Sequence, residues 1–428
     1  MFLAACGGGG GGDSGPIEAP GCDVASQNAW LRGYMSDWYY WSGASPDPDP
    51  AAYTTVATYF DALRYAGSGN VPSDRWSYIE DSAAYSQFFE EGRTLGYGVF
   101  VNGLEMVLPL KLRYVEPQSP AAAAGLKRGD VIVSINGRSA AELMASGDFE
   151  ELTPADEGEV LTVVIEEGVG TRSVALTAAT YDLTPVSVAK VLPLPDGRKA
   201  GYLVLKDFIT QAEAPLAEAF AEFRAEGATD LILDLRYNGG GRVSTSGALA
   251  SMIAGAGHAG GVFARLIYND RHRDADKVYS LASAPGPALQ RVVILTGPRT
   301  CSASELVVNG LKPFVDVVTI GDATCGKPFG FSPVESCGST FSAVNFESFN
   351  GAGAGGYYDG IAQTCAAEDD FSGELGDAAE TLTAAATSYL DTGACAPVAA
   401  ARDRTAAAVR LRAQRGPEPG DRQGMIVD

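Results

Sequence analysis

Two short segments carry side chains that could together cleave an acyl bond. Residues 300–305 (TCSASE) hold Ser302 after an apolar strand pattern and a turn, and residues 324–327 (TCGK) end on Lys327, 25 positions later (327 − 302). A serine hydroxyl is a weak nucleophile and needs a neighbouring base. A lysine can be that base only if burial keeps it neutral. We therefore predict that Ser302 is the nucleophile and Lys327 the general base of an acyl-transfer reaction.

The surroundings of Lys327 favour a neutral lysine, and the histidine content disfavours the usual alternative. Residues 325–331 (CGKPFGF) contain no carboxylate that would hold a charge on Lys327. The chain has 2 histidines: His258 lies in a glycine-rich stretch and His272 in a charged segment typical of an exposed loop. Neither setting is typical of a catalytic base, so a Ser-His-Asp triad is not expected. The competing interpretation is that Ser302 only caps a helix and Lys327 is solvated.

A tetrahedral intermediate needs hydrogen-bond donors for its oxyanion, and the sequence contains two sources. The N–H of Ala303 directly follows the nucleophile, at the start of an expected helix. Residues 238–241 (NGGG) follow an apolar strand pattern, and glycines there would let backbone N–H groups approach closely. We predict Ala303, Gly240 and Gly241 as oxyanion donors. The alternative is that the glycines form only a flexible turn.

A second group of motifs lies nearer the N-terminus. Residues 119–126 (SPAAAAGL) fit a short helix with a serine cap, a proline at its first position and a glycine stop, and residues 129–137 (GDVIVSING) fit a strand closed by an Asn-Gly turn. This order resembles the PDZ domains that accompany bacterial proteases. A PDZ domain holds the C-terminus of a peptide by backbone N–H groups and strand addition. The resemblance implies a peptide-binding segment made of Leu95, Gly96, Tyr97, Gly98 and Val99.

The segments 234–241, 300–305 and 324–327 together resemble the C-terminal processing (tail-specific) serine proteases. In that family the first serine of Ser-Ala-Ser-Glu is the nucleophile, and the lysine of a later Gly-Lys pair is the base. The resemblance covers about residues 93–395. It departs at two positions where relatives place a third polar catalytic residue: Phe331 and Pro313 stand there. The third catalytic residue is therefore left unassigned.

The coarse secondary-structure pattern predicts how these residues are positioned. An aromatic helical pattern comes first, then short strands, then strands that alternate with helices as in a layered α/β domain. We expect an α+β multidomain chain whose catalytic core is a layered α/β (crotonase/Clp-like) domain. The expected units are a tether at 1–21, a helical module at 22–92, a PDZ domain at 93–182, a protease core at 183–396 and a disordered tail at 397–428.

The cysteines point to a secreted protein. Residues 3–6 (LAAC) resemble a bacterial lipobox, which implies lipidation of Cys6, although Met1 and Phe2 cannot supply the usual signal segment upstream. The expected location is the periplasmic side of a bacterial cell envelope, with a lipid anchor on Cys6. The 6 cysteines left from 7 permit three disulfides in an oxidising compartment, with the pairing open. We also predict a bond between Cys301 and Cys325, which would join the two catalytic motifs.

Charge and composition exclude several other functions. The net charge of −22 disfavours nucleic acid as a partner. The absence of Cys-x-x-Cys, His-Glu-x-x-His and EF-hand spacing argues against a metal, and no cofactor is expected. The favoured function is an endopeptidase that docks apolar C-terminal tails of protein substrates and cleaves through an acyl-enzyme. The alternatives are a catalytically silent PDZ-bearing lipoprotein that binds tails, and a hydrolase of small esters.

Overall fold

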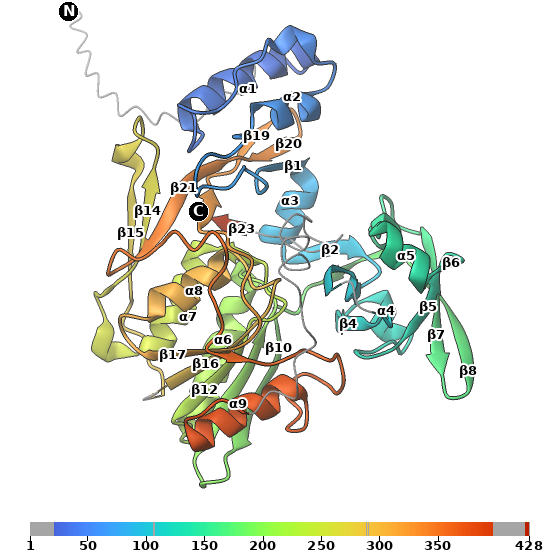
Figure 1. Cartoon of the computed structure of the whole chain (residues 1–428), viewed down its shortest axis with the longest axis vertical. Helices are drawn as coiled ribbons and strands as arrows, with labels where there is room; N and C mark the ends of the chain where they lie inside the picture. The colour runs from blue at the N-terminus through green and yellow to red at the C-terminus, as the bar shows by residue number, and fades with distance from the viewer. Residues whose placement is uncertain (1–20, 106–107, 288, 290, 397–423, 428) are drawn as a thin grey trace, which may run out of the picture.

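The computed structural model describes residues 21–105, 108–287, 289, 291–396 and 424–427. A layered catalytic core carries the N-terminal module on one end and a small β-rich domain on one side (Figure 1). No helix among the described residues meets the length and apolarity that a membrane crossing requires. The α+β architecture with an α/β core is the one that the sequence pattern predicts.

The first sheet of the core is mainly parallel and fully buried in its centre. Its strand order is β10-β11-β12-β16-β17-β22, with only β10 antiparallel to its neighbour. The strands are β10 Val186–Pro193, β11 Lys199–Leu205, β12 Asp230–Asp234, β16 Arg291–Thr296, β17 Asp316–Gly321 and β22 Cys365–Ala366. The apolar run of β12 is buried at every position, as expected of a strand covered on both faces.

Helices cover both faces of this sheet, and a second sheet lies beyond one helical layer (Figure 1). The helices are α6 Glu213–Ala225, α7 Val243–Ala254, α8 Ala303–Leu311 and, on the opposite face, α9 Thr381–Thr392. The second sheet has the order β13-β23-β18-β21-β14-β15. Its strands are β13 Gly240–Arg242, β23 Gly424–Ile426, β18 Phe329–Phe331, β21 Val344–Asn350, β14 Val262–Tyr268 and β15 Lys277–Ser280.

The N-terminal module is tied into the core rather than only resting on it. Its helices α1 Val24–Trp38, α2 Val56–Leu63 and α3 Ser82–Phe89 surround a short strand, β1 Tyr78–Asp81. That strand pairs with β20 Ser339–Ser342, which in turn pairs with β19 Val334–Ser336. Trp30 and Tyr34 belong to an apolar cluster that combines residues of the N-terminal module and of the core domain, so these aromatic residues stabilise the packing between the two.

The PDZ region contains three small sheets and two short helices. β2 Arg93–Gly96 pairs with β9 Ala179–Asp182, and β3 Val99–Val101 pairs with β4 Leu112–Val115. A third sheet has the order β6-β5-β7-β8, with strands β6 Arg138–Ser139, β5 Ile132–Ile135, β7 Val160–Glu167 and β8 Gly170–Thr177. Helix α4 Pro120–Ala123 begins after Ser119, whose hydroxyl accepts from the N–H of Ala122, as the cap motif predicts. Helix α5 Ala140–Ser146 begins after Ser139, which forms a capping box with Glu142.

One expectation about the C-terminal part needs correction. Gly424–Ile426 forms strand β23 in the second sheet, because its apolar side chains are buried there, so these residues are not part of a disordered tail. Helix α9 is capped by Glu380, whose side chain accepts from the N–H of Thr383. The expected lipidation site and glycine tether, and the rest of the tail, lie outside the described residues.

Candidate active site

Three turns at one edge of the parallel sheet hold every predicted core site residue. The turn 235–241 follows β12, the turn 297–302 follows β16, and the segment 322–328 follows β17. These three strands are neighbours and run parallel, so their carboxyl ends meet at the same edge. The middle turn therefore carries the serine between the glycine turn and the lysine turn.

Ser302 has the backbone of a strained nucleophile turn. Its φ of 61° and ψ of −114° lie where side chains other than glycine are rarely found. The residue follows a buried strand and begins helix α8, so the first helical N–H groups face the space in front of it. Its side chain is fully buried, and its Oγ has no hydrogen-bond partner among the described residues.

The carboxylate of Glu305 joins the serine turn to the lysine turn. One oxygen accepts from the backbone N–H groups of Ser302 at 2.9 Å and Lys327 at 2.8 Å. The other accepts from the N–H of Gly326 at 2.8 Å and the hydroxyl of Thr324 at 2.5 Å. Burial raises the pKa of Glu305, while these donors act in the opposite direction. Because Glu305 is fully buried, its four donors fix the spacing of both turns.

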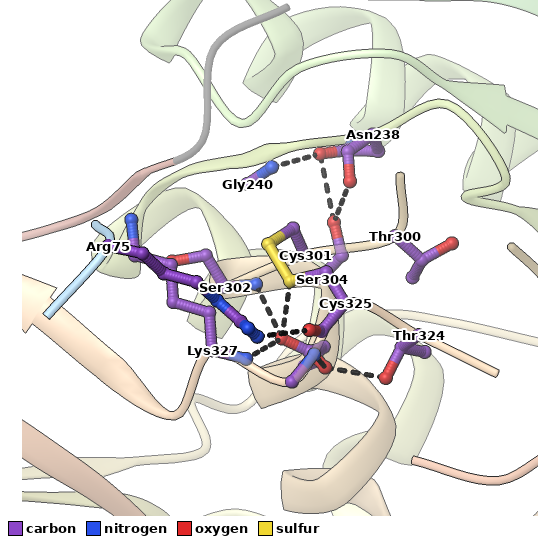
Figure 2. Close-up of a disulfide and its surroundings, with 12 residues drawn as sticks. Arg75, Asn238, Gly240, Thr300, Cys301, Ser302, Ser304, Thr324, Cys325 and Lys327 are labelled. Carbon is purple, nitrogen blue, oxygen red and sulfur yellow. Dashed lines mark hydrogen bonds between the residues drawn. A yellow bond between two sulfur atoms is a disulfide. The ribbon is translucent and has the colours of Figure 1, made fainter. Parts of the chain in front are cut away.

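A disulfide and two backbone hydrogen bonds reinforce the same arrangement. Cys301 and Cys325 are bonded to each other, as the sequence analysis predicted (Figure 2). The N–H of Cys325 donates to the carbonyl of Thr300, and the N–H of Cys301 donates to the carbonyl of Asn238. All three turns are therefore locked together by covalent or backbone contacts. Since both sulfurs are in a disulfide, they offer no thiolate to a metal, even though they lie near a Glu305 oxygen.

Lys327 is fully buried, and burial lowers its pKa to about 7. The charges of Asp74 and Glu305 act against that shift. The Nζ atom lies 4.1 Å from the centre of the Phe331 ring. Phe331, which stands where relatives carry a polar residue, thus forms part of the apolar wall around the lysine. An amine in such a setting is largely neutral slightly above neutral pH, which is what a general base needs.

Asp74 reaches this region from the N-terminal module and was not foreseen. Its carboxylate is buried and accepts from the hydroxyls of Tyr39 at 2.6 Å and Ser77 at 2.5 Å. It also accepts from the backbone N–H groups of Trp76 and Ser77. Nothing in the local sequence relates this residue to Lys327, because the two are brought together only by packing of the module on the core.

The glycine turn stands close to the serine, as predicted. Gly240 and Gly241 have φ values of 112° and 134°, which favour glycine. A Cβ on Gly240 would lie 3.0 Å from both the Ala303 nitrogen and the Ser302 Cβ. The N–H of Gly240, however, donates to Asn238 Oδ1 at 2.8 Å, so in this conformation it is not turned toward a substrate. Ala303, Gly240 and Gly241 remain predicted oxyanion donors on the basis of their position.

The side chain of Asn238 holds the glycine turn in place and was also not singled out from the sequence. Its Oδ1 accepts from Ser304 Oγ at 2.9 Å, and its Nδ2 donates to the carbonyl of Leu205. Arg236, two residues before Asn238, is buried and forms a bidentate pair with Glu380 at 2.6 Å and 3.0 Å. Glu380, which caps α9, therefore also holds the start of the glycine turn.

The predicted peptide-binding segment lies at a junction of domains. Leu95, Gly96, Tyr97, Gly98 and Val99 line one cavity together with residues of the PDZ region and of the core, Lys206 and Asp207 among them. Among the described strands, β3 pairs only with β4, so its other edge has no strand partner, although the Val101 carbonyl accepts from Arg113. The Lys206 ammonium brings a positive charge to this cavity, 3.9 Å from Asp207 and over the Phe100 ring.

The remaining sequence candidates lie elsewhere. His272 stacks on Trp38 at 3.6 Å and faces Asp37, while His258 packs against Phe314. Pro313 is exposed and follows the end of α8, whose N-cap is Ser302. The position where some relatives have an aspartate is therefore one helix length away from the nucleophile, and nothing there replaces a third polar residue.

Family profiles match three parts of the chain. Residues 199–347 match peptidase family S41, residues 26–78 match the peptidase S41 N-terminal domain, and residues 112–167 match a PDZ domain. The fold and the three turns therefore define a PDZ-bearing chain with a peptidase core. The chain therefore carries the core and the N-terminal domain of peptidase family S41 together with a PDZ domain, which confirms the family resemblance seen in the sequence.

Curated relatives and solved structures agree with this assignment. A chloroplastic C-terminal processing peptidase of Tetradesmus obliquus is 29% identical over 49% of this chain and 46% of its own. A carboxyl-terminal-processing protease of Picosynechococcus is 28% identical over 53% and 51%. The chain thus spans about half the length of these relatives. The crystal structure of an S41 protease from Bacteroides fragilis superposes with a TM-score of 0.67 at 24% identity, covering 84% of this chain and 96% of its own. A photosystem II D1 C-terminal processing protease superposes with a TM-score of 0.52 at 20% identity, covering 80% of this chain and 92% of its own. Both superpositions show the shared fold.

Replacing Glu305 by glutamine should loosen both turns. The amide nitrogen of Gln cannot accept a hydrogen bond, so donors now bound to a carboxylate oxygen would be left unpaired at a cost of about 2–4 kcal/mol of unfolding free energy. The loss of a negative charge should also lower the pKa of Lys327 further. Urea unfolding and lysine NMR titration measure the two effects. Glu335→Gln, on the exposed side of β19, is the matched control and should change neither.

Replacing Lys327 by methionine should stabilise the protein at neutral pH. The unfolded chain binds a proton on this lysine up to a pKa near 10.5, whereas the folded chain releases it near 7. The unfolding free energy of the wild type should therefore rise with pH between about 7 and 10, because the unfolded state holds more protons there. We expect Lys327→Met to be more stable at pH 7 by on the order of 2–4 kcal/mol, and the difference to vanish near pH 10. A difference that does not depend on pH would contradict a buried lysine.

Proposed function

We propose that the chain is a serine endopeptidase that uses Ser302 and Lys327 as a catalytic dyad. The observation that carries the proposal is the Glu305 bridge, which holds the backbone of the serine and of a fully buried lysine on one carboxylate. Membership of peptidase family S41 supports the same activity. A solvated lysine or a serine that only caps a helix would need neither the burial nor the strained φ of Ser302.

The proposed mechanism begins with proton transfer from Ser302 Oγ to neutral Lys327 Nζ. The oxygen attacks the peptide carbonyl, and the N–H of Ala303 with one from Gly240 or Gly241 stabilises the oxyanion. The lysine ammonium then gives its proton to the departing amine, leaving an acyl group on Ser302. Lys327 next takes a proton from a water molecule, whose oxygen attacks the ester. The Lys327 ammonium then gives this proton to Ser302 Oγ as the acid leaves, so both residues return to their starting forms.

The proposed substrates are proteins with apolar C-terminal tails. The Leu95–Val99 segment would receive the tail, with backbone N–H groups around the terminal carboxylate and strand addition on the open edge of β3. The shared cavity also contains Lys206, paired with Asp207, and Glu116, so the backbone N–H groups of the segment would be the main donors to the carboxylate. Since this cavity includes core residues, a bound tail would contact both the PDZ region and the catalytic core.

The proposed location is the periplasmic side of a bacterial envelope. The three disulfides Cys22–Cys337, Cys301–Cys325 and Cys365–Cys395 fit an oxidising compartment. The sequence predicted the Cys301–Cys325 pairing and left the pairing of the other four cysteines open. Lipid attachment at Cys6 is part of the proposal and rests on the sequence motif alone.

Ser302→Ala and Lys327→Ala should each abolish cleavage of an unstructured protein with an apolar C-terminus. Loss of the nucleophile or base is expected to lower kcat/KM by at least about 10³-fold. The wild-type rate should rise with pH through a midpoint near the lysine pKa of about 7, because only neutral lysine is a base. Lys312→Ala, at the far end of α8, is the control and should retain activity. If wild type cleaves no faster than the two variants, the chain is a silent tail-binding protein.

Amidation of the substrate's C-terminus should weaken docking. It removes the charge that the backbone N–H groups of the Leu95–Val99 segment would bind, so KM should rise by about 10-fold or more, in line with the loss of a charged hydrogen bond. The kcat value at saturation should change little. Comparison of one substrate in its acid and amide forms measures this effect, and equal KM values would remove the carboxylate-docking role.

A further inference from the structure

The second sheet contains a strand, β23, that lies beside the glycine turn and the lysine turn although its residues are far from both in the sequence. β23 Gly424–Ile426 lies between β13, which carries the glycine turn, and β18, which follows Lys327. It pairs in parallel with both, with Gly240 opposite Gly424 and Phe331 opposite Ile426. In the close-up, its ribbon passes beside Gly240 (Figure 2). The strand therefore spans from the predicted oxyanion side to the lysine side of the dyad.

The carbonyl of Gly424 lies against the glycine turn beside the nucleophile. A Cβ on Gly240 would lie 2.0 Å from this oxygen and 3.0 Å from both Ser302 Cβ and the Ala303 nitrogen. The same small space thus holds the Gly424 carbonyl, the glycine turn and the nucleophile's own turn. A substrate carbonyl about to be attacked must occupy this neighbourhood.

The contacts of β23 are those by which proteins bind an extended apolar peptide. The N–H of Gly424 donates to the carbonyl of Gly239 at 3.1 Å, and the N–H of Val427 donates to the carbonyl of Phe331 at 3.0 Å. Met425 and Ile426 are 0% and 2% exposed, in apolar clusters on either side of the strand. Main-chain pairing with alternating side-chain pockets is the mode of strand addition.

Without β23 the site would contain a slot one strand wide. Among the described strands, β13 pairs with no other strand of the sheet, and β18 pairs otherwise only with β21. The two facing edges would each present unpaired backbone groups beside the dyad. In this structure, which includes β23, Ser302 is 0% exposed, so a substrate reaches its hydroxyl only after a rearrangement.

We propose that the slot between β13 and β18 is the binding site for an extended apolar peptide next to Ser302, and that Gly424–Val427 of the same chain is its resident, displaceable occupant. The proposal rests on the proposed function and adds that the chain's own segment restrains it. The ligand class is a peptide strand with adjacent apolar residues, such as Met-Ile-Val. A bound substrate would take the place of this segment and form the same backbone pairs.

The test uses the full chain with Ser302→Ala, so that no cleavage complicates binding. A fluorescein-labelled peptide Gly-Met-Ile-Val-Asp is titrated into this protein and into the same protein carrying Met425→Asp and Ile426→Asp, which should expel the segment. We expect the labelled peptide to bind the expelled form at least 10-fold more tightly, measured by fluorescence anisotropy. Val278→Asp, an exposed position on β15 of the same sheet, is the matched control and should bind like the unaltered Ser302→Ala protein.

If the double variant does not fold, hydrogen exchange on the Ser302→Ala chain tests whether Gly424–Val427 can leave the slot. A displaceable occupant should exchange the amide protons of Gly424 and Val427 at least 10-fold faster than those in the middle of β21, through opening that leaves the core folded. Exchange at the same rate as β21 would mean that β23 is a permanent core strand, and the proposal would then be wrong. It would also be wrong if the variant folds but gains no affinity for the peptide.

Cleavage assays separate this proposal from the proposed function. In the chain with Ser302 intact, the double variant should cleave an unstructured substrate about 10-fold faster than wild type. If no form cleaves anything but the peptide binds the expelled form, the peptidase function fails and the slot remains. If wild type cleaves and neither rate nor binding changes on expulsion, the peptidase function remains and the resident-segment proposal fails.

Discussion

The arrangement of this site depends on one buried carboxylate. Glu305 accepts hydrogen bonds from the backbone of Ser302 and of Lys327, and from two further groups in the lysine turn. Two loops from different strands are thereby held to one pair of oxygen atoms in a medium where an unpaired acceptor or donor is costly. The disulfide between Cys301 and Cys325 adds a covalent link across the same gap. Because the turns are fixed in this way, the serine backbone can keep a conformation that it would leave if unrestrained.

The lysine shows how the site is built at the expense of stability. A buried amine without a close anion destabilises the folded state, and burial accordingly lowers its pKa to about 7. Phe331 contributes an aromatic face at 4.1 Å, while Asp74 and Glu305 act from the module and the core to restrain the shift. The apolar surroundings therefore lower the pKa of Lys327, while the two carboxylates limit how far it falls. The large apolar core clusters around the two sheets offset the cost.

The domains meet next to the predicted peptide-binding segment and next to Lys327. The Leu95–Val99 segment shares a cavity with core residues, and Arg128 of the PDZ region forms a buried ion pair with Asp369 of the core at 2.5 Å. The N-terminal module supplies Asp74 close to the lysine and a strand to the sheet that includes β20. The site is therefore a product of three units packed on one another. Its chemistry is concentrated in the core, but its environment comes from all three.

The sequence by itself determined the family, the strand-and-helix order of the core and the predicted pair Ser302 and Lys327, because each is encoded within a few neighbouring residues. Motif spacing also indicated the Cys301–Cys325 bond. Only the tertiary structure decided that Glu305 bridges the turns, that Asp74 approaches the lysine and that Gly424–Ile426 lies beside the glycine turn. These contacts join residues that are distant in the chain through burial and hydrogen bonding, and a local pattern does not specify which distant partner completes them. The expected disorder at 424–427 failed for that reason, since a short apolar segment becomes a strand only where two open edges receive it.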